Sequence, residues 1–328
     1  MKRVIKKTTK NPEHYMDEVL EEFISEKEAR NLSKSTIRCY RQSVNYFIDF
    51  TKSEDEEQLN CASVTQRDVF KWMNFLNNEG VKPTSINHYL RDVRTFLYWC
   101  MDESRGYIPT PFKVEMVKGQ EESIKVFTDE EQKKLIEKPA RSALYGEWRT
   151  WAIVNWILAT GNRSSTVCNI KMCDLNFTKR EIILGHTKNK QAQIIPMSSA
   201  LESVIKEFVR MWRSDASPND YLFANVGNQQ LTTNALRHSF AKYTEERGIE
   251  RTNIHGLRHT FAREFILNSG NVFMLQQLLG HKTIQMTEKY IRLFQDDYKE
   301  HFDNYNPLDQ LKKGYSRKQV VKKGGRKK

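Results

Sequence analysis

The chain has 328 residues, of which 38% are hydrophobic and 29% are charged, as expected for a rather polar globular protein. Its longest apolar run, WAIVNWILA at 151–159, is far shorter than the roughly 20 residues that cross a bilayer, which argues against a transmembrane helix. One hydrophobic core rarely extends over a chain of this length, so two domains are expected.

The N-terminus and the cysteines bear on the compartment. MKRVIKKTTK is basic but no apolar stretch follows it, which argues against a secretory signal. The cysteines are odd in number and form no CxxC pair, which favours a reduced cytoplasmic compartment over a disulfide framework. They are Cys39, Cys61, Cys100, Cys168 and Cys173.

The net charge of +12 is concentrated at the two ends of the chain. Residues 1–10 carry five Lys or Arg and residues 312–328 carry nine, and neither segment has an Asp or Glu. The body between them, residues 11–311, comes to −2. Both ends fit contacts with a nucleic-acid backbone, and they fit solvated arms equally well.

Residues 13–103 predict helices only. Apolar residues recur at helical spacing, first from Tyr15 to Ile24, then from Ile37 to Ile48, and again from Ile86 to Leu97. Between the last two, the sequence TQRD predicts a capping box ahead of a further helix. Four amphipathic helices in about ninety residues predict a compact bundle.

The stretch 106–124 contains two prolines and no sustained period, which favours an interdomain linker. A second domain then opens with a capping box at TDEE, 128–131. A helix around 148–160 is apolar on every side and is expected to be buried, ending at Gly161. Two short β-like runs follow, EIILG (181–185) and AQIIPM (192–197), and the chain from Ser198 to about Gln295 reads as helical.

Chemistry-bearing side chains gather in five short motifs of this second domain. The motifs are ATGNR, HTKNK, HGLRH, LLGH and TEKY. Arginines can neutralise a phosphate, histidines and a lysine can move protons around it, and a tyrosine can attack it. A phenol with its usual pKa near 10 needs such cations nearby to react. The candidate residues are Arg163, Lys188, His255, Arg258, His281 and Tyr290.

HGLRH has another interpretation to weigh, a zinc site, and it has a near-repeat elsewhere in the chain. Its histidines have the spacing of a zinc motif, but the glutamate that a metalloprotease needs after the first histidine is replaced by Gly256, so no metal site is predicted. The segment ALRHSF (235–240) nearly repeats GLRHTF (256–261), with Asn234 in place of His255. Arg237 and His238 of that first copy are therefore assigned to packing or to a peripheral DNA contact.

The order of these motifs resembles the tyrosine recombinase, or phage integrase, family in its compact two-domain, Xer-like form. The resemblance covers residues 125–295, and more loosely the N-terminal segments NLSKSTIRCYRQSVNYF and SINHYLRDVRTFLYW. The six candidates fall at the reacting positions of the family, and His259 falls beside them in a supporting place. Lys190 is an alternative to Lys188, and Thr166 stands where the family usually has an acidic residue.

The resemblance implies a mainly α fold with a basic arm at 1–12. A four-helix core-binding (SAM-like) domain would span 13–105 and a linker 106–124. An α+β catalytic domain with a small antiparallel sheet and a C-terminal helix would span 125–311, before a basic tail at 312–328. An aromatic stripe in that C-terminal helix is expected to dock on a neighbouring protomer. The stripe is Phe294, Tyr298, Phe302 and Tyr305, and the candidate DNA contacts in the bundle are Lys34, Arg41, Arg91 and Arg94.

The resemblance also implies a function, a site-specific recombinase that acts on double-stranded DNA in the cytoplasm of a bacterial, phage or mobile-element host. Tyr290 would form a 3′-phosphotyrosyl bond, without a metal or another cofactor. Arg163 and Arg258 would hold the phosphate, Lys188 would protonate the leaving oxygen, His255 would assist the nucleophile, and His281 would hydrogen-bond the phosphate.

The expected assembly is a homotetramer on synapsed DNA, with a monomer or weak oligomer when free and no membrane partner. Two alternatives remain open: a type IB topoisomerase, which rejoins the same strand, and a DNA-binding protein that has lost catalysis.

Overall fold

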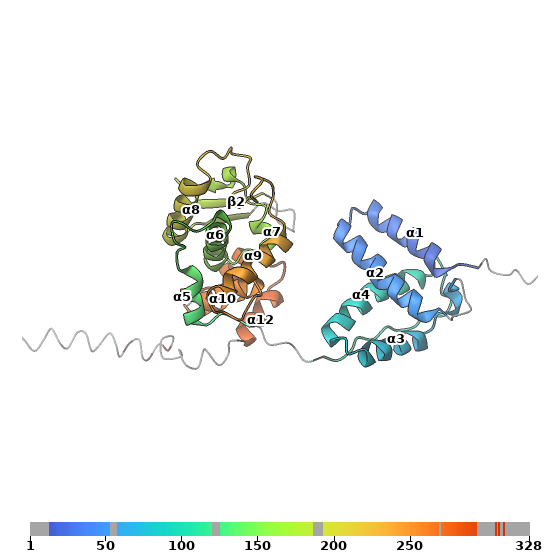
Figure 1. The fold of residues 1–328 in the computed structure, drawn as a ribbon. Helices are drawn as coiled ribbons and strands as arrows, with labels where there is room; N and C mark the ends of the chain where they lie inside the picture. The colour runs from blue at the N-terminus through green and yellow to red at the C-terminus, as the bar shows by residue number, and fades with distance from the viewer. Residues whose placement is uncertain are drawn as a thin grey trace, which may run out of the picture. The chain divides into compact units, whose positions relative to one another are not determined.

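The computed structural model describes residues 13–52, 58–119, 125–185, 193–268, 270–293, 306, 308 and 311. The chain divides into two compact units, Met1–Glu121 and Glu122–Lys328 (Figure 1). Each unit has its own hydrophobic core. Several predictions fall outside the described residues: the basic arm, the basic tail, Lys188, Lys190 and the aromatic stripe. Every helix among the described residues is too short or too polar to span a lipid bilayer.

The first unit is a helical bundle. Its helices are α1 (Met16–Ala29), α2 (Lys34–Thr51), α3 (Gln66–Asn78) and α4 (Pro83–Cys100), with a short 3-10 turn at Cys61–Ser63. Helix α2 packs against the other three helices, because its apolar stripe faces inward. Large aromatic side chains fill the core, where Phe23, Phe47, Trp72 and Phe96 are fully buried.

Most of the expected linker packs against this bundle. Ile108 and Val114 are each only 2% exposed and belong to the bundle core. The side-chain amide of Asn87 accepts from the N–H of Val117 at 2.9 Å and donates to its carbonyl at 2.8 Å. The prolines and glycines of this stretch therefore mark an irregular segment, not an unattached one, because its apolar side chains still find a surface to cover.

The second unit is built around α6 (Tyr145–Thr160). This helix is buried on nearly every side, as its sequence predicts, and it packs against α5 (Asp129–Ile136), α8 (Ser199–Trp212), α9 (Thr233–Glu245) and α10 (His255–Leu267) (Figure 1). The predicted capping box of α5 is confirmed. The Glu131 N–H donates to Thr128 Oγ1 at 3.2 Å, and the Thr128 N–H donates to Glu131 Oε2 at 2.8 Å.

A small antiparallel sheet lies beside this helical layer. It consists of β1 (Leu175–Asn176), β2 (Glu181–Leu184) and β3 (Gln193–Pro196), in that order, after a 3-10 turn at Met172–Asp174. Ile182 pairs with Ile195 on the buried face, and Ile183 pairs with Ile194 on the exposed face. The mainly α fold with a small sheet is therefore confirmed, and β1 is a strand that the sequence patterns did not indicate.

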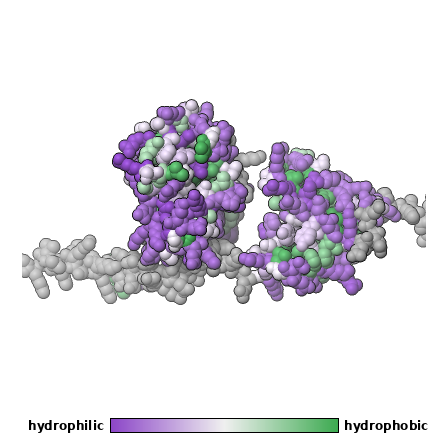
Figure 2. Space-filling model, viewed as in Figure 1, coloured by the Kyte–Doolittle hydropathy of each residue, from purple (hydrophilic) through white to green (hydrophobic). Residues whose placement is uncertain are grey.

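The expectation of continuous helix after Ser198 is wrong for residues 213–231. This stretch contains no helix, and its middle pairs with the loop before the sheet, where the Leu222 N–H donates to the Ile170 carbonyl at 2.8 Å. The local sequences SDASPND and VGNQQ are rich in turn-forming residues, which explains the break. Hydrophilic residues dominate the visible faces of both units (Figure 2).

Candidate active site

The predicted site lies where the end of α6 meets four other helices. They are α10, the short helix α7 (Ser164–Val167), α11 (Val272–Leu279) and α12 (Gln285–Leu293). Gly161 ends α6 with φ of +65°, and a Cβ built there would lie 2.4 Å from Phe261 and 2.7 Å from Leu279. Only glycine fits a backbone that is both left-handed and this crowded. The close approach brings Arg163, two residues later, against the end of α11.

Arg258 is almost fully buried, with 2% of its surface exposed. Its Nη1 donates to the Gly161 carbonyl at 2.6 Å, and its Nη2 donates to the Leu279 carbonyl at 2.9 Å. The Arg163 guanidinium donates to the same Leu279 carbonyl at 3.4 Å. The two predicted arginines therefore meet at one backbone oxygen.

Neither guanidinium forms an ion pair with a carboxylate within the described residues. Burial, and then the nearby Arg163, lower the pKa of Arg258 to about 10, so it remains charged at neutral pH. Two neighbouring cations held by carbonyls form a site that favours an anion, and the fork of a guanidinium matches two phosphate oxygens.

His281 joins this pair from the other side. It follows Gly280, which ends α11 in the left-handed conformation with φ of +61°. Its Nε2 lies 3.0 Å from Nη2 of Arg258, and its Nδ1 lies 2.8 Å from Oγ1 of Thr287. Because a guanidinium only donates, Nε2 accepts, and Nδ1 of the neutral ring then carries the proton that it donates to Thr287. Burial, with Arg258 and Arg163, lowers the pKa of His281 to about 4.

Tyr290 lies on α12 and is 5% exposed, packed in a small apolar cluster with Phe261 and Leu279. Its Oη lies 2.9 Å from Nδ1 of His259, and its ring is nearly parallel to that of His281, with centroids 6.2 Å apart. Burial raises the pKa of Tyr290, although Arg258 and Arg163 act in the opposite direction. The phenol is therefore protonated near neutral pH in the free protein.

His255 is the first residue of α10 and its side chain is exposed. Partial loss of hydration lowers its pKa, and Arg258 and Arg163 lower it further. Its ring makes an edge-on contact with that of His259, with centroids 4.6 Å apart. The histidine that directly contacts the phenol is thus His259, which the sequence placed in a supporting position.

The predicted lysine cannot be placed, because residues 186–192 lie outside the described residues. The strand that follows this turn is nevertheless tied to the site. Gln193, the first residue of β3, donates from its side chain to the carbonyls of Gln277 and Leu278, the latter at 3.4 Å. These carbonyls belong to the last turn of α11, just before His281, so Gln193 at the start of β3 lies close to the arginine pair.

Two residues of this site were missed by sequence reasoning. Thr287 was quoted only as part of TEKY, although it lies three residues before Tyr290 and so on the same face of α12. That spacing was the available signal. Gln193 offered none, because a polar residue at the start of a strand is ordinary.

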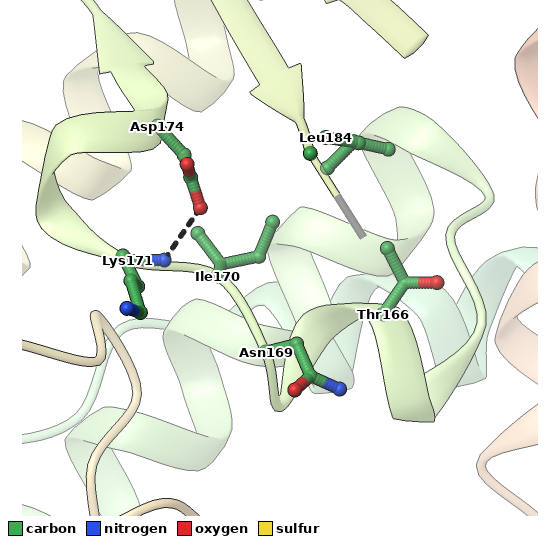
Figure 3. A pocket seen from close by; sticks show the side chains of 7 residues that line it. Thr166, Asn169, Ile170, Lys171, Asp174 and Leu184 are labelled. Carbon is green, nitrogen blue, oxygen red and sulfur yellow. Dashed lines mark hydrogen bonds between the residues drawn. The ribbon is translucent and has the colours of Figure 1, made fainter. Parts of the chain in front are cut away.

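A cavity of about 100 Å³ lies next to the site but contains none of the six predicted residues (Figure 3). It is lined by Thr166 of α7, by Leu184 and Gly185 at the end of β2, and by the loop before the sheet. In that loop the Lys171 N–H donates to the Asp174 carboxylate at 2.8 Å. Thr166, at the position where an acidic residue was expected, therefore borders open space between α7 and the strand that leads to the lysine turn.

The candidate DNA contacts of the bundle differ in their partners. Lys34 and Arg91 are exposed and Arg94 is half-buried. Arg41 is paired with Glu21 through two contacts, one of them at 3.0 Å, so its charge is already compensated. In the near-repeat on α9, Arg237 and His238 are both exposed.

Comparison with known proteins places the chain in a family. Residues 125–296 match the phage integrase family, and residues 19–106 match the phage integrase N-terminal SAM-like domain. The chain is 30% identical over 298 residues to tyrosine recombinase XerA of Pyrococcus furiosus, in an alignment that covers 90% of this chain and 96% of XerA. It is 26% identical over 283 residues to tyrosine recombinase XerD of Listeria monocytogenes, in an alignment that covers 85% of this chain and 94% of XerD.

A solved structure of a lambda integrase tetramer bound to a Holliday junction shares the fold. The TM-score is 0.67 at 16% identity, over 85% of this chain and 78% of that one. The family match spans the arginines, the histidines and the tyrosine that the structure brings together. The chain belongs to the phage integrase family and is a tyrosine recombinase.

Proposed function

We propose that Tyr290 is the nucleophile of a site-specific recombination reaction on double-stranded DNA. Its Oη attacks a backbone phosphorus, a 3′-phosphotyrosyl bond forms, and the bond to the 5′-oxygen breaks. The observation that carries this assignment is the pair of guanidiniums, Arg163 and Arg258, without a carboxylate partner among the described residues and close to a buried phenol. They hold the non-bridging oxygens and stabilise the charge that develops there.

Proton transfers complete the reaction. Lys188 gives a proton to the departing 5′-oxygen, and Lys190 is the alternative from the same turn. His255 assists at the nucleophile, and His281 hydrogen-bonds the phosphate. To donate from Nε2, His281 adopts its other tautomer, which Thr287 permits because a hydroxyl both donates and accepts. Religation to a partner strand then reverses these steps, and the phosphotyrosyl bond conserves the energy of the cut.

The proposed partners are two DNA sites brought together by four copies of the chain. The lambda integrase tetramer on a Holliday junction, which has the same fold, supports this assembly. A monomer or weak oligomer is proposed in the absence of DNA. The basic ends of the chain and exposed side chains such as Lys34 and Arg91 add salt-sensitive affinity for the phosphate backbone. The reaction takes place in the cytoplasm and integrates, excises or resolves a DNA element.

The test needs the target sequence of the protein, which is found by sequencing the DNA that the protein binds in cells. A duplex with this sequence is then the substrate. A duplex nicked near the cut site loses its short cleaved fragment, so the covalent intermediate accumulates. Wild-type protein should give an SDS-resistant adduct, and Tyr290→Phe should give none while binding DNA with nearly unchanged affinity. An adduct with Tyr290→Phe would overturn the assignment of the nucleophile.

The same DNA separates recombination from the two alternatives. Exchange of strands between two labelled duplexes supports the recombinase. Relaxation of supercoiled DNA without any exchange would support a type IB topoisomerase. Binding without an adduct in the wild type would indicate a DNA-binding protein that has lost catalysis.

A further inference from the structure

The phenol of Tyr290 needs a proton acceptor, because it is buried and a neutral phenol is a weak nucleophile. Such an acceptor must lie within hydrogen-bond reach, about 2.6 to 3.2 Å. Three histidines surround the phenol in the described part of the chain, on α10 and after α11. Their contacts show which of them meets this requirement.

Two of the three histidines are otherwise engaged. His281 stacks alongside the tyrosine ring, and its two nitrogens face Arg258 and Thr287. His255 contacts the ring of His259 and not the phenol oxygen. His259, in contrast, has its Nδ1 at 2.9 Å from the phenol Oη.

The direction of that hydrogen bond follows from the charge beside the phenol. The Arg258 guanidinium acts on the phenol of Tyr290 and lowers its pKa, and a guanidinium can only donate. Arg258 therefore presents donors to the lone pairs of the phenol oxygen, which favours donation of the phenol O–H to His259. In this arrangement Nδ1 of His259 is the acceptor, and the ring carries its proton on Nε2.

We propose that His259 is a further catalytic residue of this recombinase and takes the phenolic proton as Tyr290 attacks; the proposal rests on Tyr290 being the nucleophile. The O–H bond of the phenol breaks and an N–H bond forms on Nδ1. The phenol oxygen bonds to phosphorus, and the bond from phosphorus to the 5′-oxygen breaks. The departing 5′-oxygen receives a proton from the lysine turn, so one proton enters the reacting groups and one leaves them.

The groups that face His259 fit this role. Arg258 and Arg163 lower the pKa of the neighbouring His255, and a bound phosphate offsets the charge of both arginines beside His259. His255 contacts the His259 ring and is itself exposed to solvent. It therefore positions His259 and connects it to the bulk water. The reverse transfer from His259 to the phenol oxygen then serves religation.

The experiment measures single-turnover adduct formation at saturating nicked DNA, from pH 6 to pH 10, in four proteins. In His259→Asn, Oδ1 takes the place of Nδ1, so a hydrogen-bond acceptor remains but the base is lost. His238→Asn is the matched control, because the near-repeat on α9 places that histidine on the surface. Wild type and Tyr290→Phe complete the set, and DNA affinity and melting temperature show whether each variant is folded.

At pH 7 we expect His259→Asn to form adduct about 100-fold more slowly than wild type, the usual minimum contribution of a positioned base. Its rate should rise about tenfold per pH unit, because hydroxide then has to remove the phenolic proton, and the difference from wild type should close by about pH 9. His238→Asn should follow wild type in its rate at saturating DNA, because the loss of a surface contact outside the site changes only the DNA affinity. In a fifth protein, His259→Ala, added imidazole should restore part of the rate at pH 7.

Two results would overturn the proposal. One is a His259→Asn protein within threefold of wild type at pH 7. The other is a slow His259→Asn protein whose pH profile has the wild-type shape, since that would assign His259 a merely structural role. An adduct in Tyr290→Phe would instead overturn the choice of nucleophile, so the two failures are distinguishable.

Discussion

Helices α9 and α10 carry almost the same six residues, ALRHSF and GLRHTF, and use them differently. The apolar positions behave alike, because Leu236 and Leu257 are both fully buried in the same core. The next residue does not: Arg237 is exposed, whereas Arg258 is 2% exposed and holds two backbone carbonyls.

The difference comes from the elements that contact each helix and not from the six residues. Residues of α10 contact the left-handed end of α6, the end of α11 and the tyrosine of α12. Arg237 is exposed and has no comparable set of contacts among the described residues. A short motif thus supplies a helix with an inward apolar face and two polar groups, and the rest of the fold decides whether these groups meet a reacting phosphate.

The largest expected effect contrasts the two arginines directly. Arg258→Ala should raise the barrier to adduct formation by about 3 kcal/mol or more, because a preorganised charge stabiliser is lost. Arg163→Ala should behave in the same way. Arg237→Ala should leave the single-turnover rate at saturating DNA nearly unchanged. A fast Arg258→Ala protein, or an equal loss in Arg237→Ala, would break the comparison.

A second contrast concerns two glycines with the same backbone conformation. Gly161 has φ of +65° and is crowded by Phe261 and Leu279, whereas Gly248, after α9, has φ of +63° and nothing within 4 Å of an added Cβ. Both Gly→Ala changes incur the left-handed strain, about 1 kcal/mol. Only Gly161→Ala adds a clash, which should cost roughly 1–3 kcal/mol more in the free energy of unfolding. Urea unfolding of both variants measures this, and equal losses would contradict the crowding.

A smaller effect is expected at Thr287, whose hydroxyl lies 2.8 Å from Nδ1 of His281 and can bond it in either tautomer. Thr287→Val keeps the shape but removes the hydroxyl, and should slow adduct formation about fivefold, since one neutral hydrogen bond contributes roughly 1 kcal/mol. Thr287→Ser should restore the rate. If Val and Ser variants cleave equally fast, the hydroxyl does not govern His281.

The smallest expected effect is that of metal removal. The proposed chemistry uses two arginines, a lysine and histidines in the places where a metal ion would stabilise charge or activate a group. EDTA should therefore leave the rate of adduct formation unchanged. A rate that collapses in EDTA and returns with Mg²⁺ would require a different account of the phosphate site.

Much of the fold could be predicted from sequence, for reasons that differ between elements. The helical bundle follows from apolar spacing that every helix repeats, and α6 follows from its uniformly apolar surface. Strand β1 could not be predicted, because two residues carry no period. The attachment of residues 106–119 to the bundle was also missed, since turn-forming residues conceal the burial of Ile108 and Val114.

The site shows the same division. Family spacing identifies Arg163, Arg258 and Tyr290, and the structure brings these three together. Which histidine meets the phenol could not be read from spacing, because His255 and His259 lie one helical turn apart on the same face. The choice depends on how α12 packs across α10, which is a tertiary property.

The central claim is that Tyr290 forms the covalent bond to DNA, and mass spectrometry of the adduct tests it most directly. The adduct is trapped on nicked DNA, digested with nuclease and trypsin, and sequenced by fragmentation. The account predicts a nucleotide 3′-phosphate attached to the side chain of Tyr290. A nucleotide on any other residue, or one attached through its 5′-phosphate, would contradict it.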